Sequence, residues 1–177
     1  MKQLTYLDLQ LAKFDLDNRF QGLRSLLSSL KEIPKLASFR LFCKGEELSD
    51  EEVEIIALNL AEERRYLETL ELNFYHARNL GNKSLLALQN GLRNLLSLRS
   101  LTLAFGSMNI FSQKIVLELS EVLSLLKCLE EIKLGFPSRN MPLNFDNLPN
   151  KMGGHWNLET FTVNQKSCLR NRNQNLR

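Results

Sequence analysis

The sequence predicts an α/β solenoid in which short parallel strands form a concave face and helices form a convex face. Three observations predict it: one apolar motif occurs six times, its copies are almost evenly spaced, and leucines at helical spacing fill the intervals. The 177 residues suit a single domain, with 44% hydrophobic and 24% charged residues as in an ordinary globular protein.

The strands are predicted by the motif L-x-x-L-x-L, in which Phe, Ile or Val can replace Leu. Its copies follow one another at a nearly constant interval and lie at residues 4–9, 36–41, 67–72, 98–103, 129–134 and 158–163. Apolar residues at alternate positions are typical of a strand with one buried face. Six copies at this spacing predict six stacked strands that pair in parallel.

Two further registers follow each strand. Phe74, Phe105 and Phe136 are evenly spaced, seven positions after the first leucine of their motifs, and we expect them to form a spine in the core. Eleven or twelve positions after that leucine, a polar residue precedes an apolar one. These pairs predict a turn and a buried plug at Asp15-Leu16, Glu47-Leu48, Asn79-Leu80, Asn109-Ile110 and Asn140-Met141.

A helix is predicted after each of the first four strands, from apolar residues three or four apart. The sets are Leu23, Leu27 and Leu30; Val53, Ile56 and Leu60; Leu85, Leu88, Leu92 and Leu95; and Ile115, Leu119, Val122 and Leu126. Ser49 and Glu52 have the spacing of a capping box. The acidic residues of 46–54 are therefore interpreted as helix-start electrostatics, with a metal or partner site as the less favoured alternative.

With these motifs, the sequence resembles the leucine-rich-repeat family, in particular its ribonuclease-inhibitor-like branch, from Leu4 to Val163. The resemblance implies a right-handed leucine-rich-repeat solenoid forming a short arc, with parallel strands on the concave face and helices on the convex face. Asn79, Asn109 and Asn140 lie about three residues beyond the family's asparagine position, which we interpret as a loop insertion. We divide the chain into a repeat domain of about six units, residues 1–163, and a polar basic tail, residues 164–177.

The pleat of each strand predicts which side chains reach the concave face, because residues between the buried leucines point the other way. This face has mixed charge, which suits a protein partner, although it is also compatible with a solvated sheet face. The predicted partner-binding residues are Tyr6, Asp8, Gln10, Arg40, Phe42, Glu71, Asn73, Thr102, Glu131, Lys133, Thr160 and Thr162.

The net charge of +3 is too small to indicate nucleic-acid binding by itself, but the basic residues are uneven. No acidic residue follows Glu159, whereas the tail carries Lys166, Arg170, Arg172 and Arg177. We interpret the tail as a solvated end, with contact to an acidic partner as the alternative.

Residues for chemistry are sparse. Cys43, Cys128 and Cys168 are too far apart for a zinc motif, and their odd number does not suggest a disulfide framework. His76 and His155 have no metal-ligand spacing, and we expect both in loops. The sequence therefore predicts no catalytic residue, no metal and no cofactor.

The two ends of the stack are expected to be bare. Leu4 starts the first motif without a preceding polar unit, and no helical pattern follows the sixth strand. We expect a protein-interaction module, a structural or adaptor subunit of a larger intracellular assembly, most simply cytoplasmic, with no membrane span. A cytoskeletal, nuclear or organellar assembly is also compatible. The alternative functions are regulation of a small GTPase and RNA or ribonucleoprotein binding through the tail.

Overall fold

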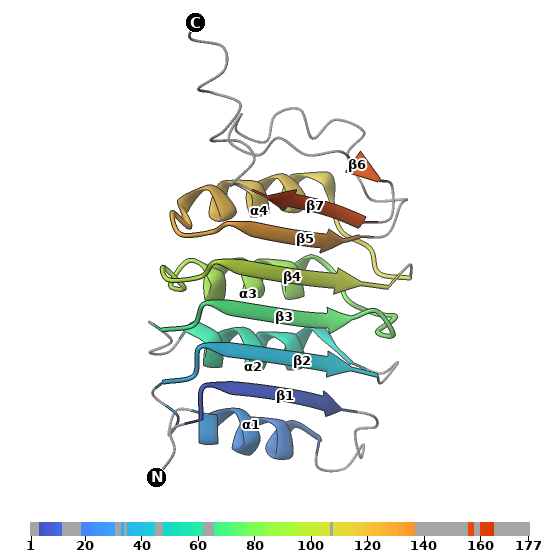
Figure 1. The fold of residues 1–177 in the computed structure, drawn as a ribbon. Helices are drawn as coiled ribbons and strands as arrows, with labels where there is room; N and C mark the ends of the chain where they lie inside the picture. Colours follow the sequence, from blue (N-terminus) through green and yellow to red (C-terminus); the bar gives the residue numbers. More distant parts are fainter. Residues whose placement is uncertain are drawn as a thin grey trace, which may run out of the picture.

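The computed structural model describes residues 4–11, 19–30, 33, 35–44, 48–61, 66–106, 108–136, 156–157 and 160–164. Strands and helices alternate along most of the described chain, and the four helices in these ranges lie on the same face of one sheet (Figure 1). None of the helices in these ranges is long and apolar enough to cross a membrane.

The prediction of an α/β fold is confirmed, with five neighbouring parallel strands and four helices among the described residues. The strands are β1 (Tyr6–Leu11), β2 (Ser38–Cys43), β3 (Thr69–Phe74), β4 (Ser100–Phe105), β5 (Glu131–Gly135), β6 (Trp156–Asn157) and β7 (Thr160–Asn164). The helices are α1 (Arg19–Ser29), α2 (Asp50–Ala61), α3 (Asn82–Leu92) and α4 (Gln113–Leu125).

Each of the first five strands starts within its predicted motif, and β1 to β4 each pair with the following strand in a register that follows the repeat. Leu70 of β3, for example, lies opposite Phe39 of β2 on one side and Leu101 of β4 on the other. In β2, β3 and β4 the motif residues are buried and the residues between them are half-exposed. The alternation expected from the pleat is therefore confirmed.

The phenylalanine spine is also confirmed. The ring of Phe105 lies between Phe74, 5.7 Å away, and Phe136, 5.1 Å away and stacked. Phe111, which the periodicity did not single out, contacts Phe105 edge-on at 4.9 Å and Phe136 at 5.8 Å. Four aromatic rings thus link three consecutive units within the core.

The predicted plugs are correct at Leu48 and Leu80, which are buried, but wrong at Ile110, whose side chain is 74% exposed. Phe111, only 3% exposed, occupies the core in its place. The physical reason is register: Phe111 follows Leu80 by the same interval that separates the phenylalanines of the spine. Asp15, Leu16, Glu47, Asn140 and Met141 lie outside the described residues.

Of the three asparagines predicted to support the turns, Asn109 does so and Asn79 does not. Asn109 is buried, and its Oδ1 accepts a hydrogen bond of 2.9 Å from the backbone N–H of Leu80 in the preceding unit. Asn79 is exposed, whereas Ala77 and Leu80 of the same turn are buried. Of the described asparagines of this set, only Asn109 therefore bonds to the backbone of the preceding unit.

Replacing Asn109 by alanine should lower the free energy of unfolding by about 1.5 kcal/mol, because the buried N–H of Leu80 would lose its acceptor. Urea denaturation followed by circular dichroism measures the change. Asn79→Ala is the matched control, since the same side chain is removed from an exposed position. Equal losses for the two variants would contradict the structural role assigned to Asn109.

Polar side chains bond to the backbone at the starts of α2, α3 and α4. Only the contact at the start of α2 was predicted, from the acidic residues of 46–54. The backbone N–H of Ser49 donates to the Glu52 carboxylate at 2.7 Å, which is one half of the predicted capping box. Contacts between units were not predicted: Asp50 Oδ1 accepts from the Gly81 N–H at 2.8 Å, and Asn82 Oδ1 accepts from the Ser112 N–H at 2.7 Å. The first residue of one helix thereby fixes the residue before the next.

The α2 and α3 backbones come unusually close at Gly91. A Cβ atom at this position would lie 2.7 Å from the carbonyl oxygen of Ala57. Only glycine leaves room for the two helices to pack at this separation. No comparable contact occurs at Gly22 in α1, where a Cβ would meet nothing within 4 Å.

The sixth motif forms a strand, but its predicted parallel pairing is wrong. β7 runs antiparallel to β5, with Ile132 opposite Val163, and β6 pairs antiparallel with β7. A parallel neighbour needs a crossover, usually a helix. The sequence between β5 and β6 contains Pro137, Pro142 and Pro149, and proline is unfavourable in the interior of a crossover helix.

Candidate interaction surface

One face of the sheet carries no helix of the described residues, and we call it the open face. It carries the alternate residues of β1 to β5, and the strand register aligns these residues in rows across the sheet. The central row consists of Asp8, Arg40, Glu71, Thr102 and Lys133. Its first three members alternate in charge, so neighbouring strands present opposite charges directly side by side.

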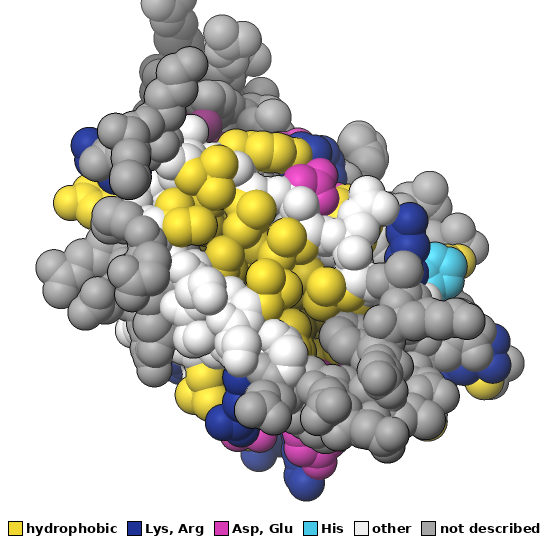
Figure 2. Space-filling model, turned by 90° about the horizontal axis from the view of Figure 1, so that it is seen from below, with side chains coloured by type: hydrophobic (Ala, Val, Ile, Leu, Met, Phe, Trp, Pro, Cys, Tyr) yellow, Lys and Arg dark blue, Asp and Glu magenta, His cyan; other side chains and the backbone are white. Residues whose placement is uncertain are grey.

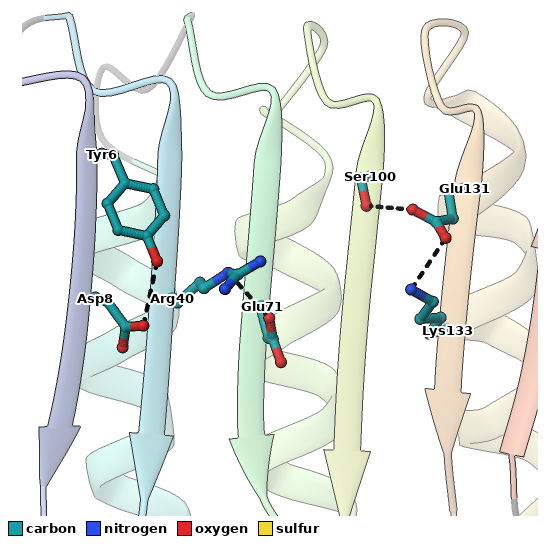
Figure 3. Close-up of polar contacts among 7 residues, drawn as sticks. All are labelled: Tyr6, Asp8, Arg40, Glu71, Ser100, Glu131 and Lys133. Carbon is teal, nitrogen blue, oxygen red and sulfur yellow. Dashed lines mark hydrogen bonds and ion pairs between the residues drawn. The ribbon is translucent and has the colours of Figure 1, made fainter.

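Arg40 joins the first three strands on this face. Its Nε lies 3.2 Å from Glu71 Oε2, and its guanidinium carbon lies 5.8 Å from the centre of the Tyr6 ring (Figure 3). The hydroxyl of Tyr6 donates to Asp8 Oδ2 at 3.2 Å. These contacts hold an aromatic ring and three charges in fixed positions while leaving them accessible.

A second polar group lies across β4 and β5. Ser100 Oγ donates to Glu131 Oε2 at 3.1 Å, and Lys133 Nζ lies 3.0 Å from Glu131 Oε1 (Figure 3). The hydrogen bond from Lys133 is the main reason why the pKa of Glu131 is held below its ordinary value; Ser100 adds to this, and partial burial opposes it. These contacts therefore favour the negatively charged form of Glu131.

The structure brings together the predicted residues of β1 to β5. Gln10, Phe42 and Asn73 share a second row, with Phe42 half-buried between its two polar neighbours. By register, Thr162 of β7 lies next to Lys133, while Thr160 lies beyond the β5 pairing; the side chains of both are outside the described part of the chain. The predicted tail contacts Lys166, Arg170, Arg172 and Arg177 also lie outside the described residues.

The described histidine and cysteine residues do not form a catalytic or metal-binding site. The ring of His76 is exposed and packs edge-on against Tyr75 at 5.6 Å. Burial raises the pKa of the Cys43 thiol to about 12, with a smaller contribution from Glu52, so that this cysteine is a protonated core residue. Cys128 is exposed. Within the described ranges, no three side chains of the metal-binding types gather closely enough to hold an ion, and His155 and Cys168 lie outside them.

Sequence reasoning missed a group of exposed apolar side chains in the loops that follow β3 and β4. Tyr75, Met108 and Ile110 are each more than 60% exposed. The backbones of the two loops touch, because a Cβ on Gly106 would overlap the carbonyl oxygen of Tyr75. The available signal was a departure from the repeat: Tyr75 and Ile110 fall next to the buried positions Phe74 and Phe111 of their units.

Comparison with protein-family models finds no match, and comparison with curated proteins finds no significant similarity. The interpretation of the open face therefore depends on its own geometry and charge.

Proposed function

We propose that this chain is a leucine-rich-repeat protein of the ribonuclease-inhibitor-like type and works as a non-catalytic protein-interaction module. The even spacing of its motifs and their register across β1 to β5 support the family assignment. In this proposal the partner binds the open face, and the chain is a structural or adaptor subunit with no chemistry of its own.

The observation that carries the proposal is the ordered mixture of charge on the open face. Arg40 and Glu71 contact each other, and Glu131 is held by Ser100 and Lys133, so these side chains are positioned before any partner arrives. A prearranged surface loses less side-chain freedom on binding than a mobile one. Arranged charges also select a partner with the complementary pattern.

The same charges favour a protein partner over nucleic acid. Three acidic residues, Asp8, Glu71 and Glu131, are interleaved with Arg40 and Lys133 on the open face. Phosphate backbones require clustered cations, which this arrangement does not provide. We expect the partner to present both a cation and an anion, spaced to meet Glu131 and Lys133 or Arg40 and Glu71.

The proposal is tested by purifying the N-terminally tagged full-length chain from its native cells and identifying the proteins that remain bound. Lys133→Glu should reduce the bound companions several-fold, because it reverses a charge of the open face. Lys114→Glu is the matched control: Lys114 also pairs with a glutamate, Glu118, but from helix α4 on the other side of the sheet.

Loss of the companions in Lys133→Glu together with their retention in Lys114→Glu would support binding through the open face. Equal retention in both variants would overturn that assignment. A chain that carries no companion from its native cells would overturn the proposal that it is an interaction module.

A further inference from the structure

Strand β1 forms one outer edge of the sheet and pairs only with β2 among the described strands. The carbonyl of Thr5 accepts from the Ser38 N–H at 2.9 Å, and that of Leu11 accepts from the Lys44 N–H at 2.8 Å. Backbone groups of alternate residues in a strand point in opposite directions. Those of Asp8 and Gln10 therefore point away from β2, toward the outer edge, where they can pair with another strand.

The core is also open at this end. Leu7, Leu9 and Leu11 are only half-buried, whereas their register partners on β2, Phe39, Leu41 and Cys43, are fully covered. Figure 2, which views the molecule from the side of β1 and α1, shows hydrophobic side chains gathered across the centre of this end. In the rest of the stack, the neighbouring unit covers the equivalent surface.

The exposed side of α1 has small residues that a second helix can approach. Gly22, Ser25 and Ser29 lie on this side, opposite the buried Leu23 and Leu27. The hydroxyls of Ser28 and Ser29 already donate to the carbonyl of Ser25, at 2.9 and 2.8 Å. Covering Ser29 therefore does not leave its hydroxyl without a partner.

We propose that this end binds the same end of a second copy of the chain, with the two β1 strands antiparallel about a twofold axis at Leu9. In this register Leu7 lies opposite Leu11 of the second copy, and Leu9 lies opposite Leu9. Each of the three leucines therefore packs against a leucine of the other chain. Asp8 lies opposite Gln10, and the outward backbone groups of these residues form the hydrogen-bonded pairs. A shift to an axis at Asp8 would instead place two carboxylates directly opposite each other, which is unfavourable.

Charge complementarity supports a second copy as the occupant. Lys44 Nζ donates to the side-chain oxygen of Gln10 at 3.0 Å, so its ammonium group is held beside the position that Asp8 of the second copy would take. The twofold axis forms this Asp8–Lys44 pair twice. The resulting assembly would be one continuous sheet with both open faces on the same side, and it does not depend on the function proposed above.

Sedimentation equilibrium of the purified full-length chain should show a concentration-dependent mass that approaches about 41 kDa, twice the 20.5 kDa of one chain. Asp8→Lys and Lys44→Asp should each raise the dimer dissociation constant about tenfold, since each places like charges together at two sites. The double variant Asp8→Lys/Lys44→Asp should restore it to within about twofold of the original value. Both residues are exposed, so circular dichroism should show an unchanged fold.

A second variant tests the strand pairing without changing charge. Gln10→Pro removes an N–H that points to the outer edge, a position where an edge strand tolerates proline. This variant should remain folded and sediment as a monomer. A wild-type mass of 20.5 kDa at every concentration would overturn the proposal, as would single charge reversals that leave the dissociation constant unchanged. Lys133→Glu should leave the mass unchanged, so failure of the open-face proposal is distinguishable from failure of this one.

Discussion

Replacing Phe105 by alanine is expected to lower the free energy of unfolding by about 3–5 kcal/mol. Phe105 is almost fully buried and contacts the rings of Phe74, Phe111 and Phe136, so its removal leaves a cavity shared by three units. Because these rings are themselves fixed by neighbouring units, they cannot close the cavity by small movements. Urea denaturation followed by circular dichroism gives the change in free energy.

Tyr75→Ala serves as the control for this variant. Tyr75 is also aromatic and directly follows Phe74 of the spine, but it is 62% exposed. Its replacement should change the free energy of unfolding by less than about 0.5 kcal/mol. A loss below about 1 kcal/mol for Phe105→Ala would show that the spine is not a rigid part of the core.

Gly106→Ala is expected to destabilise the fold by about 3 kcal/mol, the upper end of the cost of overpacking. A methyl group at this position would overlap the carbonyl oxygen of Tyr75 and would lie 3.1 Å from that of Ala77. Both atoms belong to the backbone, so neither can move aside as a flexible side chain would. The turn after β4 would have to separate from the turn after β3.

Gly22→Ala is the opposite case and the internal control. A Cβ at Gly22 meets nothing within 4 Å, and the residue lies inside α1. Alanine there should raise the free energy of unfolding by about 0.5–1 kcal/mol, since alanine favours the helix and restricts the unfolded chain. Thermal melting of both variants should show a lower melting temperature for Gly106→Ala and a higher one for Gly22→Ala. A stabilised Gly106→Ala protein would contradict the contact between the two turns.

Most of the α/β framework could be predicted from the sequence, because the repeating motif determines where the strands and helices lie. A motif whose apolar residues alternate with polar ones specifies both the strand and the face that it buries. The residues of the open face followed directly from this pattern, as Arg40 and Glu71 illustrate. Their ion pair could not be predicted, since it depends on the register between two strands that lie a full repeat apart in the sequence.

The errors arose where one residue decides between alternatives. Ile110 and Phe111 are both apolar and are adjacent in the sequence. Only the path of the backbone determines which of the two side chains enters the core. Similarly, the sixth motif has the apolar pattern of a strand but carries no information on direction, which is set by the connection before it. The contacts of Asp50 with Gly81 and of Asn82 with Ser112 have no local signature, because each joins two units.

The close approach at Gly91 predicts that the stack resists pulling unevenly along its length. Where α3 meets α2, backbone touches backbone, and a Cβ on Gly91 would lie 2.7 Å from the Ala57 carbonyl oxygen. Dispersion contacts are strongest where atoms approach most closely over an extended surface. When the chain is pulled from its two ends, the outer units are therefore expected to peel away first. The second and third units, which contain α2 and α3, should separate last.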